Sequence, residues 1–311
     1  MGRAQGIGHA ISLTGQRTPG NTEAAFAAVF GTRRGTAHCR YHTPRFTFQL
    51  TSAFRGDPQL KQRLLDRISQ HEMAGTIDCG ECNVQDADGF ITKESAIGRE
   101  LRELHMLGEP EPHHWYREVG AALGIPAGLA QIEQEIFSGL ALDDSRMRWP
   151  RRFIEALPVG VELGQAFADR LAARRLREAV LPCAPNWPEI VRARVVATIE
   201  QALAALEGLE SRATARETAH ETAMMCFGTA ALSEATQASA WAAWSAVSDP
   251  SDGRSWSAGD ATRAALLDHV LPQSGPKAHC LVWRAESDRI IEELEALRDK
   301  RPYVAKSAVP I

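Results

Sequence analysis

The chain has 311 residues, of which 44% are hydrophobic and 24% are charged, and its formal net charge is −4 at pH 7. This composition is that of an ordinary globular protein long enough for one large domain or two moderate ones, and the small charge gives no global case for binding nucleic acid or a membrane. Six irregularly spaced cysteines and the lack of a run of ~20 apolar residues lead us to expect a cytoplasmic protein with reduced thiols and no membrane partner.

The N-terminal part of the chain is basic. Residues 1–64 contain nine Lys or Arg against two Asp or Glu, and a further group of arginines lies between positions 146 and 177. Such clusters mark surfaces that bind nucleic acid or a ribonucleoprotein, although arginines that cover apolar surface on a solvated helix give the same pattern. If nucleic acid is the partner, the expected contacts are Arg33, Arg34, Arg40, Arg45, Arg174 and Arg175.

Four residues in the N-terminal third have the types and spacing of metal ligands. Cys39 and His42 are separated by two residues, and so are Cys79 and Cys82. Two ligands at this spacing can bind one ion from a single tight turn, and two such turns complete tetrahedral zinc, with Zn–S distances of about 2.3 Å. The alternative is a buried cysteine, a surface histidine and a reduced or redox-active pair at 79 and 82, although no βαβ pattern supports a thioredoxin-like dithiol.

The first helix predicted in this part of the chain covers residues 21–31. Asp57 followed by Pro58 is a stronger signal, because an Asp cap with proline in the first turn is typical of helix N-termini. Glu72 continues the four-residue spacing of this helix and is expected to point inward. The apolar stripe of the same helix is Leu60, Leu64, Leu65 and Ile68.

A further helix is predicted from Thr92 to Gly108, after which Pro110 and Pro112 interrupt the pattern. We therefore predict a mainly α protein. A mixed helical and irregular module, which the zinc ion would stabilise, occupies residues 1–110, and a helical bundle occupies residues 111–311.

The bundle is predicted from successive apolar stripes. The stretch 214–247 is rich in Ala, Thr and Ser, so we expect a tightly packed central helix that breaks at Gly228. The last helix has an apolar side and a densely charged side and is expected to dock on the bundle or on a partner. The predicted helical segments are 115–124, 129–136, 163–171, 191–206, 214–247, 260–270 and 285–300.

A second pattern of metal-ligand residues lies within the bundle. Glu217 and His220, followed by Glu221, fit a Glu-x-x-His motif, and di-iron sites in helical bundles combine such motifs with glutamates from other helices. Glu111 and His114 form a second motif of this kind. Further carboxylates are available at Glu72 and Glu100. Met224, where a zincin would have its second histidine, excludes that class of protease. The alternative is a hydrogen-bonded polar pair at positions 217 and 220.

Residues 113–125, HHWYREVGAALGI, resemble the helices of haem-oxygenase-like di-iron oxidases, in which a histidine precedes an aromatic or leucine residue and an Ala-Leu-Gly sequence. The resemblance implies a helical fold and a non-haem iron centre. It covers only these residues, and the rest of that family's ligand pattern does not map onto this chain.

These patterns support two classes of function. The first is a zinc-stabilised, mostly helical binding or scaffold protein that contacts nucleic acid or a ribonucleoprotein through its basic N-terminal module, while the helical remainder binds protein. The second is a non-haem iron or di-iron oxygenase built around Glu217 and His220. A helical partner-binding protein without a metal is a third reading.

Overall fold

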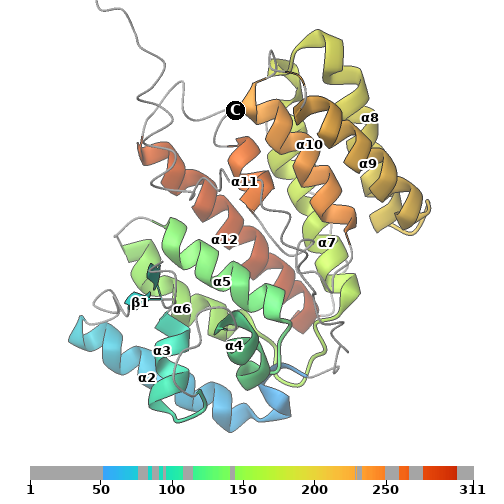
Figure 1. Ribbon diagram of the computed structural model, residues 1–311. Helices are drawn as coiled ribbons and strands as arrows, with labels where there is room; N and C mark the ends of the chain where they lie inside the picture. The colour runs from blue at the N-terminus through green and yellow to red at the C-terminus, as the bar shows by residue number, and fades with distance from the viewer. Residues whose placement is uncertain are drawn as a thin grey trace, which may run out of the picture. The chain divides into compact units, whose positions relative to one another are not determined.

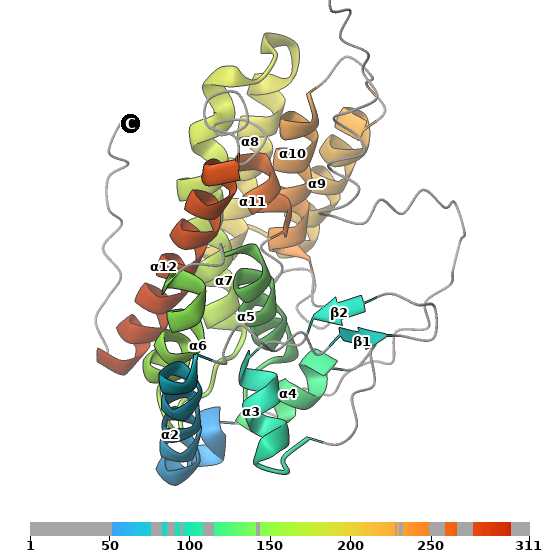
Figure 2. The ribbon, with the colours of Figure 1, turned by 90° about the vertical axis from the view of Figure 1, so that its left-hand side faces the viewer.

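The computed structural model describes residues 52–75, 83–85, 91–93, 96–107, 115–140, 144–227, 229, 233–248, 259–265 and 276–299. These residues are mainly helical, which confirms the predicted fold class (Figures 1 and 2). Residues Arg45–Ile311 belong to one compact unit. The predicted helix over 21–31 and the four proposed zinc ligands, Cys39, His42, Cys79 and Cys82, lie outside the described residues.

The first helices in the chain precede and follow a small antiparallel sheet. This sheet pairs β1 (Asn83–Gln85) with β2 (Ile91–Lys93) and sets Val84 opposite Thr92. The helical elements of this part are η1 (Ala53–Gly56), α2 (Pro58–Ala74), α3 (Ala96–Glu103), α4 (Trp115–Leu123), α5 (Ala127–Gly139) and α6 (Asp144–Ala156).

The second half of the chain contains the longest helices. Its elements are α7 (Gln165–Arg175), the π-helical turn η3 (Leu176–Val180), the 3₁₀ helix η4 (Leu181–Asn186), α8 (Glu189–Leu206), α9 (Arg212–Phe227), α10 (Glu234–Val247), α11 (Gly259–Ala265) and α12 (Pro276–Asp299). The predicted break near residue 228 is confirmed, since α9 and α10 are separate helices that pack against each other.

Helix α2 begins and ends where the sequence indicates. The Asp57 side chain accepts a hydrogen bond of 2.8 Å from the Gln59 backbone N–H, and Pro58 occupies the first turn, where its missing N–H costs nothing. Leu60, Leu64 and Ile68 are buried, as their spacing predicts. The helix ends at Gly75, whose φ of 65° is left-handed and suits glycine.

Helix α3 is shorter than predicted. It starts at Ala96, because Thr92 is paired in the small sheet and does not open a helix. Ile97 and Leu101 are fully buried, as the apolar spacing predicts, and they bring α3 against α2 and α4. This position of α3 matters for the site described below.

Two hydrophobic cores are built from these helices. The first is built from η1, the helices α2 to α6, and parts of α7 and α12, and the fully buried Trp149, Phe54 and Phe153 are among its largest side chains. The second is formed by α8, α9, α10 and α11 around Trp187, and it contains many alanines, which allow these helices to approach one another closely.

Helices α7 and α12 connect the two cores. Phe167 and Leu171 of α7 pack in the first core, whereas Ala172 and Leu176, in the following turn, pack in the second. Helix α12 contacts α5, α6, α7 and α11. The predicted division at residue 110 does not separate two cores, since α2 and α3 share the first core with α5 and α6.

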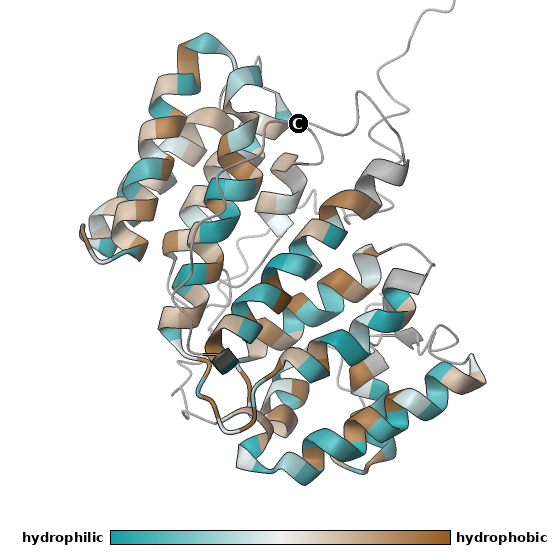
Figure 3. Ribbon diagram, turned by 180° about the vertical axis from the view of Figure 1, so that it is seen from behind, coloured by the Kyte–Doolittle hydropathy of each residue, from teal (hydrophilic) through white to brown (hydrophobic). Residues whose placement is uncertain are grey.

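Hydrophobic and hydrophilic residues alternate along the helices, as Figure 3 shows for α2 and α12. Within the described ranges, none of the helices combines the length and apolar character that crossing a membrane requires.

Candidate metal site between α2 and α3

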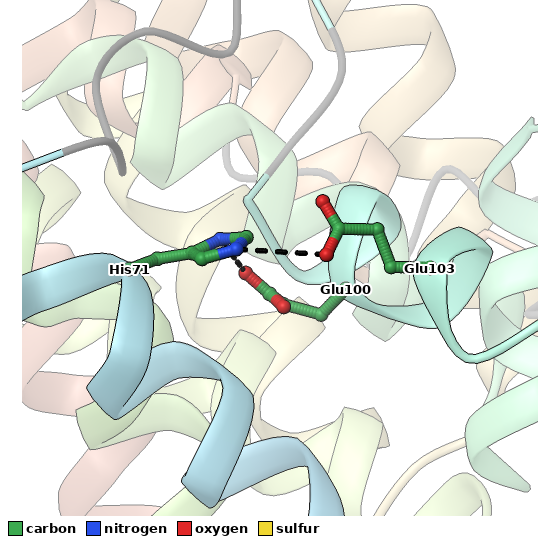
Figure 4. Close-up of side chains that lie close together, drawn as sticks. All are labelled: His71, Glu100 and Glu103. Carbon is green, nitrogen blue, oxygen red and sulfur yellow. Dashed lines mark ion pairs between the residues drawn. The ribbon is translucent and has the colours of Figure 1, made fainter. Parts of the chain in front are cut away.

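Three potential metal ligands meet where the last turns of α2 approach α3 (Figure 4). His71 extends from α2 toward Glu100 and Glu103 on α3. His71 Nδ1 lies 2.6 Å from Glu100 Oε1, and Nε2 lies 3.5 Å from Glu103 Oε2. One ligand atom from each residue lies within 4.8 Å of the other two, and in the described part of the chain this is the group of His, Cys, Asp and Glu side chains that could hold a metal ion.

The local sequence explains why these side chains converge. The stripe of Leu60, Leu64 and Ile68 holds one face of α2 against the core, and this places His71 at the edge of the α2–α3 contact. On α3, the buried Ile97 and Leu101 fix the rotation of the helix. Glu100 and Glu103, three residues apart, then share the face that is turned toward α2.

Two arginines surround this group. Arg67, one turn before His71 on α2, forms an ion pair with Glu103, and its Nε lies 3.7 Å from Glu100 Oε2. Arg99, on α3, reaches Glu103 Oε1 over 3.2 Å. In the described structure, two guanidinium groups therefore accompany two carboxylates around one imidazole.

Burial differs strongly among the three potential ligands. The side chain of Glu100 is 2% exposed, that of His71 13% and that of Glu103 30%. Glu100 Oε2 is also buried without a hydrogen-bond partner among the described residues. A buried carboxylate oxygen that lacks such a partner is costly, so this atom would gain from an additional cation or donor.

The titration behaviour of the group follows from this burial. Burial raises the pKa of Glu100 to about 7, although Arg67 and Arg99 act in the opposite direction. Burial also lowers the pKa of His71, and Arg99 and Arg67 lower it further. The two arginines thus only partly offset the burial of Glu100, and they disfavour the protonated form of His71.

This donor set suits a divalent transition metal. Imidazole nitrogen binds zinc and iron, and carboxylate oxygens complete such sites, whereas Mg²⁺ and Ca²⁺ are held mainly by oxygen ligands. Three protein donors would leave one position of a tetrahedral ion for water or a further ligand.

Glu72, proposed from sequence as an iron ligand, has a different partner. Its Oε2 accepts a hydrogen bond of 2.7 Å from Arg151 Nε, and a second nitrogen of the same guanidinium also contacts it. Glu72 therefore joins α2 to α6 and does not lie among the potential ligands of His71, Glu100 and Glu103.

The Glu-x-x-His motif of α9 faces away from the core. Glu217, His220 and Glu221 are all exposed, and the His220 ring packs against Trp244 with centroids 5.5 Å apart. The buried face of α9 instead carries Ala215, Ala219, Thr222, Ala223 and Cys226. Since these small residues allow close approach to α8 and α10, the bundle packs on this face, whereas the motif lies on the exposed face of α9. His114, of the second motif, lies outside the described residues.

Arg174 and Arg175, which the sequence analysis predicts as nucleic-acid contacts, are buried in the structure. Their side chains are 6% and 4% exposed, and both are paired with glutamates of α12. An arginine in this setting serves an internal ion-pair network and presents no charge to a polyanion. The remaining four predicted contacts, Arg33, Arg34, Arg40 and Arg45, lie outside the described residues.

Sequence reasoning identified Glu100 as an available carboxylate but missed His71 and Glu103. The spacing of Glu100 and Glu103 was the available signal, because residues three apart share a helix face. Nothing in the sequence pairs them with a histidine about thirty residues earlier. That contact depends on how α3 packs against α2.

Comparisons with protein-family models, curated proteins and solved structures found no match to this chain.

Proposed function

We propose that this protein is a metal-binding helical scaffold in which a divalent transition-metal ion, held by His71, Glu100 and Glu103, fastens α3 to α2. The observation that carries the proposal is the convergence of one imidazole and two carboxylates within 4.8 Å, with one of the carboxylates buried and incompletely compensated. A divalent ion would supply the missing positive charge and a ligand for the unpartnered oxygen.

The position of the three ligands on two helices supports a structural role for the ion in a protein that binds a partner. The ligands come from two helices that are separated along the chain by residues 75–95, so one ion would close this loop. Metal binding that closes a loop adds to the free energy of folding, because the unfolded chain lacks the assembled site. The surface that this part of the protein presents to a partner would then depend on the ion.

Zinc is the ion we propose, and Fe²⁺ is the alternative. Zinc accepts one nitrogen and two oxygen ligands at about 2.0 to 2.2 Å and needs no change of oxidation state to hold two helices together. Fe²⁺ also binds imidazole and carboxylates and would be expected at the same residues. A zinc site formed by Cys39, His42, Cys79 and Cys82 remains a separate prediction from the sequence.

The test is metal binding by the full chain. Protein stripped with a chelator and dialysed would be titrated with Zn²⁺, Fe²⁺ under anaerobic conditions, and Mg²⁺ in a calorimeter, and its metal content measured by elemental analysis. We expect the wild type to bind one equivalent of Zn²⁺ or Fe²⁺ and little Mg²⁺, and its melting temperature to rise when the metal is bound. His71→Ala and Glu100→Gln should each lose the bound Zn²⁺ or Fe²⁺.

Two controls make the result specific. His220→Ala removes an exposed histidine from α9 and should leave metal binding unchanged, whereas Cys79→Ser combined with Cys82→Ser tests the cysteine site. Metal that survives His71→Ala and Glu100→Gln but disappears in the cysteine variant would overturn the proposal.

A further inference from the structure

Arg67 occupies the position from which a cation would neutralise both carboxylates of the candidate site. Its guanidinium group reaches Glu103 directly and lies 3.7 Å from Glu100 Oε2, the buried oxygen without a hydrogen-bond partner among the described residues. Arg67 and His71 are four residues apart on α2, so both side chains extend from the same face of the helix toward the same pair of carboxylates.

Arg67 and Arg99 already place two positive charges beside Glu100 and Glu103 without a metal, although Glu100 Oε2 has no hydrogen-bond partner among the described residues. Adding a divalent ion next to two guanidinium groups would bring like charges together in a partly desolvated space, where their repulsion is stronger than in water. At least one arginine must therefore leave before the ion can bind tightly.

Exposure indicates which residues can move. The side chain of Arg67 is 33% exposed and that of Arg99 28%, so either guanidinium can swing into water on its flexible stem. Glu100, at 2% exposure, has no such freedom. The buried Glu100 carboxylate is thus the fixed member of a site for which two kinds of cation compete.

We propose that Arg67 is a displaceable counter-ion of this site, which holds α3 against α2 in the metal-free protein and is released to solvent when the divalent ion binds. This inference rests on the proposed metal-binding function. The contact between α2 and α3 then persists in both states, while the half-buried Arg67 side chain exchanges its carboxylate partners for solvent. Any molecule that binds the released guanidinium would favour the metal-bound state.

The experiment compares the affinity of chelator-stripped full-length protein for Zn²⁺ in the wild type and in Arg67→Met. Methionine keeps an unbranched apolar stem and removes the competing charge. We expect Zn²⁺ to bind Arg67→Met on the order of tenfold more tightly or better, because the ion no longer displaces a guanidinium. Arg67→Lys should lie between Arg67→Met and the wild type.

The matched control is Arg63→Met. Arg63 is one turn earlier on the same helix and pairs with Asp57 over 3.7 Å, away from the candidate ligands. Its loss should leave the Zn²⁺ affinity unchanged. Far-ultraviolet circular dichroism of each variant establishes that the helices are intact.

The outcomes separate this inference from the proposed function. If the wild type binds Zn²⁺ through His71 but Arg67→Met binds it equally or more weakly, the counter-ion proposal is overturned and the metal site stands. If neither protein binds Zn²⁺ at His71, both proposals fail. Binding at His71 in Arg67→Met alone would support competition by Arg67 and would overturn metal binding by the natural chain.

Discussion

Arg175 and Glu286 form an ion pair inside the protein, with Nη2 2.6 Å from Oε1 and side chains that are 4% and 0% exposed. Arg289, three residues later on α12, also binds Glu286 over 3.0 Å and continues to Glu178 in the π-helical turn η3. These contacts join α12 to the segment that runs between the two hydrophobic cores. The relative position of α7 and α12 is therefore fixed by charges as well as by apolar packing.

Arg175→Met should destabilise the protein by about 3 to 5 kcal/mol, because it leaves the buried Glu286 carboxylate with only part of its positive surroundings. Chemical denaturation of the full chain, followed by circular dichroism, measures this change. The control is Arg177→Met, which breaks an ion pair with Glu207 whose side chains are 36% and 44% exposed, and which should cost less than about 1 kcal/mol. A loss below 1 kcal/mol in Arg175→Met would contradict the role given to the pair.

Glu286 should also contribute to acid sensitivity. Burial alone would raise the pKa of Glu286, but Arg175 and Arg289 outweigh it and hold that pKa below its ordinary value of 4.5. A carboxyl group whose folded-state pKa is depressed stabilises the protein above its unfolded-state pKa, and this contribution is lost as the pH falls through the folded-state pKa. Stability should therefore decrease below about pH 4.5.

The measurement is the free energy of unfolding from pH 7 to pH 3 for the wild type and Glu286→Gln. The variant should be less stable near neutral pH, and the difference between the two proteins should shrink as the pH falls below the ordinary glutamate range. Glu295→Gln, at an exposed position on the same helix, controls for the loss of one negative charge. A difference that stays constant across this range would show that Glu286 does not titrate as described.

The sequence predicted elements well where the signal is local. The start of α2 follows from Asp57 and Pro58, and the end of α4 follows from Gly124, because capping and turn residues act on their own neighbours. The apolar stripes of α2 and α5 likewise identified buried residues, since helix periodicity fixes which side chains share a face.

The candidate site was harder to predict because its residues are polar and distant along the chain. The sequence does not indicate that His71 and Glu103 lie close together, because their contact forms only when α3 packs against α2. The same applies to α12, on which the charged residues Glu286, Arg289 and Glu293 are buried. The two glutamates pair with arginines of α7, more than one hundred residues earlier in the chain, and nothing in the local pattern reports such a pairing. Arg289 pairs with Glu286 and with Glu178 of η3.

Arg212 should stabilise the bundle by holding the end of α10. Its guanidinium donates hydrogen bonds to the carbonyl oxygens of Ala246, Val247 and Ser248, and it forms an ion pair of 2.6 Å with Asp169 of α7. The carbonyls at a helix C-terminus lack partners within the helix, so a cation there satisfies them and interacts favourably with the helix dipole.

Arg212→Ala should therefore lower the free energy of unfolding by about 2 to 3 kcal/mol, because charge-assisted hydrogen bonds are lost and the carbonyls are left unpaired. Arg216→Ala removes the same side chain one turn later, at an exposed position of α9, and should change stability by less than about 0.5 kcal/mol. Equal effects of the two substitutions would show that the contacts of Arg212 carry no special weight.

At Gly124, a single added methyl group should be strongly destabilising. Its φ is 68°, and a Cβ there would overlap the Ser52 carbonyl oxygen and lie 3.0 Å from the Arg55 nitrogen. Both of these atoms belong to the backbone around η1, whose own Phe54 and Arg55 have positive φ values of 54° and 53°. The segment therefore has little freedom to move away, and Arg55 also donates to the Ala121 carbonyl oxygen at the end of α4.

Gly208→Ala separates the backbone cost from the steric cost. Gly208 has a similar φ of 75°, and no atom lies within 4 Å of the added Cβ, so its substitution carries only the cost of a left-handed alanine, about 1 kcal/mol. Gly124→Ala adds overpacking against rigid backbone, so its total should reach about 3 kcal/mol or more. Thermal unfolding of the two variants measures the difference. Equal melting temperatures would mean that η1 yields to the methyl group, and that the contact between η1 and the end of α4 is not the rigid junction that its hydrogen bonds indicate.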